Sequence, residues 1–169
     1  IIVSLVGSEM CIRDSLYSGE SRKSSVAEEL KILCEKSGAG LEVHEVDILN
    51  GGSEHNLLDT EAQARWESRI ADGEFDVVIV TPPCSSWTRS LFRPGGPPPV
   101  RDKRHPWGLP NATNAIRARA KQGNEFIHFA IRAASAAHRA KASGATCRLL
   151  LEHPEDLGRS KHGTPASIW

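Results

Sequence analysis

The hydrophobic positions of the chain change repeatedly between the spacing of a strand and that of a helix. Short apolar runs predict four strands, at residues 16–17, 41–48, 75–80 and 146–151. Apolar residues at helical spacing predict three helices between them, at residues 25–38, 59–73 and 123–142. Strands that alternate with helices are typical of βαβ units, so we expect an α/β fold with a mostly parallel sheet.

Local signals mark where the predicted helices begin and end. Ser25 and Glu28 have the spacing of a capping box, and Gly38 follows the last apolar position of the first helix. The second helix is expected to begin near Asp59 and to end at Gly73. These boundaries can be compared directly with hydrogen bonds in a structure.

Two stretches fall outside this alternation. Prolines and glycines crowd residues 93–111, which predicts a long irregular loop of the kind that is usually functional or disordered. The opening stretch as far as Ser15 resembles a translated adapter peptide, so we expect residues 1–15 to be a non-native leader. The alternative is that residues 1–6 form a real buried strand. The remainder, 16–169, is then one partial domain.

Composition and charge narrow the possible functions only slightly. The chain holds 21 basic and 21 acidic residues, so any basic surface for nucleic acid must be local. The 4 cysteines include no C-x-x-C pair and have no histidine at metal-ligand spacing, which predicts neither a disulfide framework nor a metal site. No apolar run approaches the ~20 residues of a membrane-spanning helix, so we expect no membrane partner.

Residues able to do chemistry follow the predicted strand ends. Gly19, Asp47, residues 82–84 and Glu152 each come directly after a predicted strand. The carboxyl ends of parallel strands share one edge of a sheet, and ligands bind at that edge. Each residue alone has a structural explanation, such as a helix cap for a carboxylate or a small buried side chain for a cysteine. Together they predict one site.

Three of these segments resemble motifs of the DNA cytosine carbon-5 methyltransferases. Residues 76–84, which end in Thr-Pro-Pro-Cys, are similar to the Pro-Cys motif of that family. Residues 149–154, Leu-Leu-Leu-Glu-His-Pro, resemble its later motif, in which a strand ends in Glu-Asn-Val or Glu-Asn-Pro. The stub at 16–19 is similar to the first motif. The resemblance spans about residues 16–158 and implies a Rossmann-like sheet with helices on both faces, incomplete at the C-terminus.

The resemblance also implies a cofactor, a partner and residue roles. S-adenosylmethionine is the expected methyl donor and DNA the expected substrate, with RNA not excluded, in an intracellular location that is nuclear in a eukaryote. Cys84 is the expected nucleophile, and Glu152 is expected to hydrogen-bond or protonate nitrogen 3 of cytosine. The residues expected to bind the donor are Ser18, Gly19, Asp47 and Pro82. The residues expected to contact the nucleic acid are Pro83, Ser85, Ser86, His153, Pro154, Arg101 and Arg104.

Departures from the family pattern leave other functions open. The first motif has a single glycine, Ser85 stands where glutamine is usual, and His153 stands where asparagine is usual. These departures, and the absence of the later family motifs, favour a non-catalytic remnant or nucleic-acid-binding module of a larger protein, such as one from a mobile element. A third possibility is an exocyclic-amine methyltransferase, in which an aromatic residue takes the place of Cys84. No G-x-G-x-x-G fingerprint supports an oxidoreductase.

Overall fold

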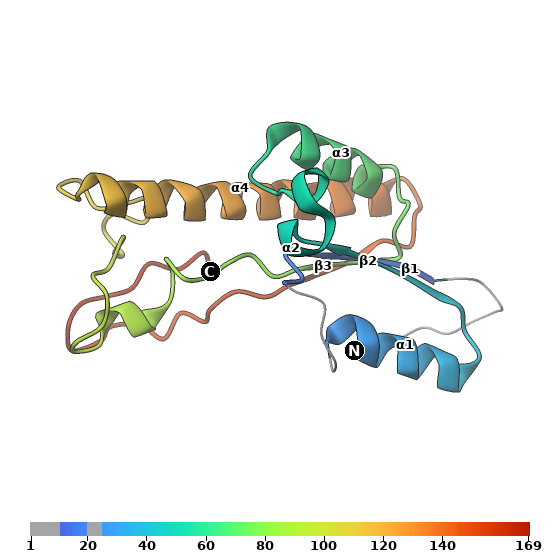
Figure 1. The fold of residues 1–169 in the computed structure, drawn as a ribbon, viewed down its shortest axis with the longest axis horizontal. Helices are drawn as coiled ribbons and strands as arrows, with labels where there is room; N and C mark the ends of the chain where they lie inside the picture. Colours follow the sequence, from blue (N-terminus) through green and yellow to red (C-terminus); the bar gives the residue numbers. More distant parts are fainter. Residues whose placement is uncertain (1–10, 20–24) are drawn as a thin grey trace. The chain divides into compact units, whose positions relative to one another are not determined.

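The structure of the chain is a computed structural model that describes residues 11–19 and 25–169 (Figure 1). Its contacts divide the described chain into two compact units. The first unit comprises the described residues up to Thr81 together with Ile131–Leu151, and the second comprises Pro82–Ala130 together with Glu152–Trp169. Of the predicted leader, residues 1–10 lie outside the described residues, and the non-native origin of 1–15 stays a prediction.

A parallel sheet forms the centre of the first unit. Its strands are β1 (Cys11–Leu16), β2 (Leu41–Val46), β3 (Val77–Val80) and β4 (Arg148–Leu151). They lie in the order β2-β1-β3-β4, and every neighbouring pair is parallel. The predicted α/β fold with a parallel sheet is therefore confirmed. Strand β1 is longer than the predicted stub, because it begins at Cys11.

The strands end together at one edge of this sheet. Leu16 pairs with Val46 on one side and with Val80 on the other, and Val80 pairs with Leu151. These four residues are the last of their strands. The predicted alignment of the strand ends is confirmed, so the segments that follow them all leave the sheet at the same edge.

Helices cover both sides of the sheet within the first unit. Helix α1 (Val26–Ser37) lies on one side and α3 (Thr60–Ala71) on the other (Figure 1). Each turns a buried face inward, which includes Leu30 and Cys34 in α1 and Trp66 and Ile70 in α3. The side chains of Val78 and Val80 in β3 are fully buried, as expected for a strand covered on both faces.

The predicted caps are present at both helices. The side chain of Ser25 accepts a hydrogen bond from the backbone N–H of Glu28 at 3.2 Å, and Gly38 ends α1 in the left-handed conformation with φ 71°. The Asp59 carboxylate accepts from the first N–H groups of α3. After β2, Asp47 caps the short helix α2 (Ile48–Gly51), which is followed by the 3-10 turn η1 (Gly52–His55).

Helix α4 (Asn114–Ala142) begins nine residues before its predicted start near 123. Its first turns, Asn-Ala-Ile-Arg-Ala-Arg-Ala-Lys-Gln, are rich in strong helix formers and contain one large apolar residue. These turns therefore show no apolar periodicity. The segment before this helix is irregular apart from the 3-10 turn η2 (Arg89–Phe92), which agrees with the predicted loop at 93–111.

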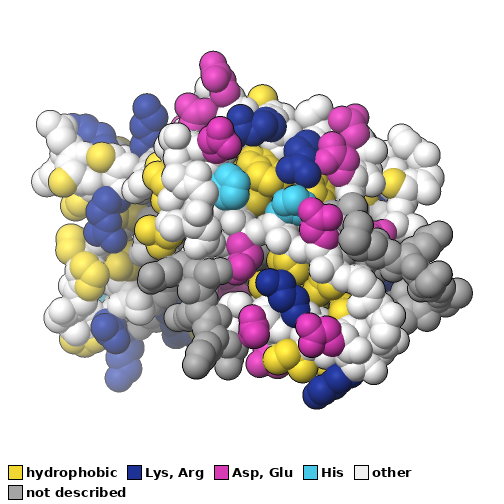
Figure 2. All heavy atoms as spheres, turned by 45° about the vertical axis from the view of Figure 1, so that its right-hand side comes forward, with side chains coloured by type: hydrophobic (Ala, Val, Ile, Leu, Met, Phe, Trp, Pro, Cys, Tyr) yellow, Lys and Arg dark blue, Asp and Glu magenta, His cyan; other side chains and the backbone are white. Residues whose placement is uncertain are grey.

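The second unit has its own small core. Trp87, Ile127 and Ala166 are buried together, and Ile168 packs against them. On one face of the molecule, acidic and basic side chains are mixed, with hydrophobic patches between them (Figure 2). Among the helices that the structure describes, none is both long and apolar enough to cross a membrane.

Candidate functional site

In the first unit, the predicted methyl-donor residues Ser18 and Gly19 form a turn after β1 that is hydrogen-bonded to Asp47, the residue after β2. The backbone N–H of Gly19 donates to Oδ2 of Asp47 at 3.1 Å, and the N–H of Leu49 donates to Oδ1 at 3.0 Å. The side-chain amide of Asn50 donates to the Ser18 hydroxyl at 3.0 Å and to the Gly19 carbonyl at 2.8 Å. The structure therefore brings Ser18, Gly19 and Asp47 together, as the sequence predicts.

Tyr17 precedes this turn in an unusual backbone conformation. Its φ of 62° lies in the left-handed region that residues other than glycine rarely adopt. The side chain is buried, and burial raises the pKa of the phenol far above its usual value. The Thr81 hydroxyl donates to the Tyr17 carbonyl at 3.2 Å and so links the turn to the end of β3. Tyr17, Asn50 and Thr81 are not among the predicted site residues. Tyr17 and Thr81 lie inside the quoted motifs, but the resemblance implies no role for either of them, and Asn50 lies outside the motifs.

The hydrogen-bonding groups of this turn are compatible with binding of an adenosine ribose. Each Asp47 oxygen accepts one backbone N–H, and a carboxylate oxygen can accept a second donor such as a ribose hydroxyl. A Cβ added at Gly19 would meet nothing within 4 Å. The Pro82 side chain is fully buried, and its expected contact with the methyl donor stays a prediction.

In the second unit, the chain turns sharply at Cys84. The backbone N–H groups of Trp87 and Thr88 donate to the Cys84 carbonyl at 2.8 and 3.0 Å. Pro83 and Ser85 are exposed, Ser86 is buried, and Cys84 is half-buried with a free thiol. The Cys84 thiol is thus held in a short turn and remains partly open to solvent.

The residues after β4 alternate in exposure. Glu152 is exposed, His153 is 7% exposed, and Pro154 accepts a hydrogen bond at its carbonyl from the Trp169 indole at 3.0 Å. Within the described ranges, no hydrogen bond joins Cys84 and Glu152. In this motif, the His153 side chain faces the interior of the unit, and the Glu152 side chain faces solvent.

His153 lies against the core tryptophan of the second unit. Its ring meets the edge of Trp87 with 5.6 Å between the ring centroids. Neither ring nitrogen has a hydrogen-bond partner in the described part of the chain. Burial, and then the positive charge of Arg101, lower the pKa of His153 from 6.5 to about 4. His153 is therefore neutral at physiological pH and acts as a packing residue, which departs from the expected contact with nucleic acid.

Arg101 is also an interior residue. Its guanidinium lies 3.8 Å from the centre of the Trp87 ring, and the side chain is 1% exposed. Its five N–H groups donate to five acceptors, which are the carbonyls of Ser86, Pro106 and Ala120, the Ser86 hydroxyl and the Asn124 side chain. An arginine has five donors, so none is left for a phosphate. The predicted phosphate contact of Arg101 is wrong, whereas Arg104 is exposed.

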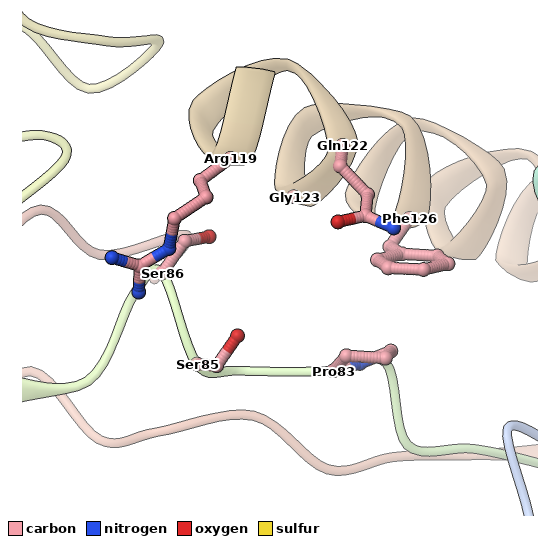
Figure 3. A pocket seen from close by; sticks show the side chains of 7 residues that line it. All are labelled: Pro83, Ser85, Ser86, Arg119, Gln122, Gly123 and Phe126. Carbon is pink, nitrogen blue, oxygen red and sulfur yellow. The ribbon is translucent and has the colours of Figure 1, made fainter. Parts of the chain in front are cut away.

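A pocket lies between the loop after Cys84 and the first half of α4 (Figure 3). It holds about 280 Å³ of space when open solvent is included, but its cavity volume is about 40 Å³, well below the ~300–1,000 Å³ of sites for small molecules. The residues that line it are Pro83, Ser85, Ser86, Arg119, Gln122, Gly123 and Phe126. Neither Cys84 nor Glu152 is one of them.

Part of the pocket wall consists of predicted site residues. Pro83, Ser85 and Ser86, which were expected to contact the nucleic acid, line it, and their contact with a substrate stays a prediction. The four lining residues from α4 were not predicted. Arg119 and Gln122 lie in the part of the helix that the sequence pattern did not predict, and Gly123 and Phe126 belong to no quoted motif. No group of three or more metal-ligating side chains occurs among the residues that the structure describes.

Comparison of the chain with family models, with curated proteins and with solved structures finds no match. The functional assignment therefore depends on the residues of the two units themselves.

Proposed function

We propose that this chain carries the nucleophile of an S-adenosylmethionine-dependent methyltransferase that acts on carbon 5 of cytosine in DNA. One observation carries the proposal. Cys34 and Cys147 are buried, whereas Cys84 is partly exposed and lies in a tight turn four residues after a strand of a parallel sheet. A partly exposed thiol is accessible to a substrate, which is one requirement of a cysteine nucleophile. The parallel sheet with helices on both sides also supports a Rossmann-like fold.

The proposed reaction starts at the Cys84 sulfur. Its thiolate adds to carbon 6 of cytosine, which forms a carbon–sulfur bond and moves the electrons of the carbon 5–carbon 6 double bond to carbon 5. S-adenosylmethionine supplies the methyl group that carbon 5 then takes. Loss of the carbon 5 proton to solvent restores the double bond and expels the Cys84 thiolate.

Glu152 and the turn of Ser18 and Gly19, which would bind the methyl donor, support this reaction in separate ways. Glu152 is exposed, and no hydrogen bond of the described residues occupies its carboxyl group, so it is able to bond to nitrogen 3 of a base as charge develops on the ring. In the first unit, Ser18, Gly19 and Asp47 are the residues that would hold the methyl donor, with Asp47 as the acceptor for its hydroxyl groups.

Trapping the covalent intermediate tests the proposal. The full chain is incubated with S-adenosylmethionine and DNA that contains 5-fluorocytosine, because fluorine cannot leave carbon 5 as a cation and the carbon–sulfur bond persists. We expect a denaturation-resistant adduct with the wild-type protein and with Cys34→Ser, and none with Cys84→Ser. An adduct that survives Cys84→Ser disproves the assignment of the nucleophile.

A second candidate function, nucleic-acid binding without methyl transfer, is favoured by one specific observation. The pocket beside Cys84 is lined by Arg119, Gln122 and two serines, and it includes neither Cys84 nor Glu152. Calorimetry with S-adenosylhomocysteine separates the two functions. Binding that Asp47→Ala abolishes supports the methyltransferase, and no binding by a folded chain that still binds DNA supports the second function.

A further inference from the structure

The pocket beside α4 presents hydrogen-bond donors and no acidic group. Its four polar side chains are those of Ser85, Ser86, Arg119 and Gln122, and its remaining lining residues are Pro83, Gly123 and Phe126. Arg119 extends from α4 toward the loop that carries the two serines (Figure 3). One full positive charge therefore borders the pocket without a carboxylate among the lining residues.

The donors of these side chains are not used inside the protein. Arg119 is exposed, and in the described ranges its guanidinium donates to no acceptor. Ser86 is 3% exposed, and its hydroxyl oxygen accepts a hydrogen bond from Nη2 of Arg101 at 3.1 Å. Because no described acceptor takes the Ser86 hydroxyl proton, that proton is available to an occupant of the pocket. The hydroxyl of Ser85 likewise bonds to no other described residue.

A second positive charge lies directly behind the pocket wall. Arg101 is buried, and all five of its acceptors are neutral, so no carboxylate of the described residues balances its charge. A Cβ added at Gly123, which lines the pocket, would lie 2.9 Å from Nη2 of Arg101 and 2.2 Å from the Ser86 hydroxyl. The potential of a buried, unbalanced cation is weakly screened and favours an anion nearby.

We propose that this pocket binds a phosphate group. An arginine fork, two hydroxyls and an amide approach from different directions, which matches the several oxygens of a tetrahedral phosphate. The space is small for a whole nucleotide and open to solvent, so a single phosphate is the part that enters. The phosphate comes either from a nucleic-acid backbone or from a free phosphate compound. The proposal does not depend on methyl transfer.

Two probes and three variants test the site in the absence of any methyl donor. A fluorescently labelled single-stranded oligonucleotide reports backbone phosphate through its anisotropy, and inorganic phosphate at constant ionic strength reports free phosphate through calorimetry. The variants are Arg119→Gln and Ser85→Ala, which change exposed side chains of the pocket, and Arg117→Gln, which removes an exposed arginine of the same helix that does not line it.

We expect Arg119→Gln to weaken binding about tenfold, the effect of losing one charge-assisted contact. For the oligonucleotide, the slope of log affinity against log salt concentration should also fall by about 0.7. Ser85→Ala should have a smaller effect, and Arg117→Gln should match the wild type. If Arg119→Gln weakens the binding of inorganic phosphate alone, the natural ligand is a free phosphate compound. If it weakens the binding of the oligonucleotide, the natural ligand is the phosphate of a nucleic-acid backbone.

The proposal is overturned if the wild-type chain binds neither probe, or if Arg119→Gln and Arg117→Gln bind both probes equally well. Cys84→Ser provides the separation from the methyltransferase function. This variant should bind inorganic phosphate like the wild type, because Cys84 does not line the pocket. Phosphate binding can therefore fail while the covalent adduct forms, or the reverse.

Discussion

Backbone pairing sets the position of each segment in the first unit, whereas a few buried side chains do so in the second. In the first unit, four parallel strands are joined in register and their helices are capped by local side chains. In the second, Arg101 links residues 86, 106, 120 and 124, which belong to three separate segments. A regular sheet tolerates the loss of one side chain better than such a hub does, so the two units should respond differently to mutation.

The largest effect is expected at Arg101. Arg101→Lys replaces the five N–H donors of a planar guanidinium with three N–H donors on a single nitrogen. Some of the buried carbonyls then lose their hydrogen-bond partner. We expect the free energy of unfolding in urea to fall by about 3 kcal/mol. Arg104→Lys, at an exposed position in the same loop, should change it by less than about 0.5 kcal/mol. Equal effects of the two substitutions would contradict the role of Arg101 as a hub.

An effect of up to about the same size is expected from the pH dependence of His153. Its pKa is about 4 in the folded chain and near 6.5 in the unfolded chain. The unfolded state therefore binds a proton first as the pH falls, and stability is lost from about pH 6.5 down to about pH 4. His153 accounts for up to about 3 kcal/mol of this loss. His153→Phe retains a ring beside Trp87, and its unfolding free energy should decline less over the same range. An identical decline in both proteins counts against a neutral, buried His153.

The smallest of these effects is expected in the first unit, at Asp47. Asp47→Ala removes the cap of α2 and the acceptor for the Gly19 N–H. We therefore expect the free energy of unfolding, measured by thermal unfolding, to fall by about 2 kcal/mol. Asp47→Asn keeps one acceptor oxygen and should lose about half as much. A loss at Asp47 that exceeds the loss at Arg101 would reverse the comparison between the units.

The difference between the units also explains which features the sequence predicted. The boundaries of α1 and α3 depend on residues next to them, Ser25, Gly38 and Asp59, so a local pattern was sufficient to find them. The shared edge at the strand ends follows from parallel topology alone. Ser18, Gly19 and Asp47 were therefore predicted to lie together, and they do.

Features of the second unit depend on contacts between residues far apart in the sequence. Nothing in the run of prolines and basic residues around Arg101 distinguishes a buried arginine from an exposed one such as Arg104. The difference arises largely from four acceptors that lie 15 to 23 residues away, on Ser86, Ala120 and Asn124. Arg119 was missed for another reason, because alanine-rich helical turns lack the apolar period on which the prediction relied.

The most direct test of Cys84 as the nucleophile needs no methyl donor. Addition of a thiolate to carbon 6 makes carbon 5 of cytosine accept a solvent proton, after which loss of its original hydrogen and expulsion of the thiolate regenerate the base. A single-stranded oligonucleotide with deuterium at carbon 5 of cytosine is incubated with the full chain, and its mass is measured over time. We predict loss of the deuterium with the wild-type protein and with Cys34→Ser, and its retention with Cys84→Ser. Equal loss with Cys84→Ser, or retention with a wild-type chain that binds the oligonucleotide, would contradict the account.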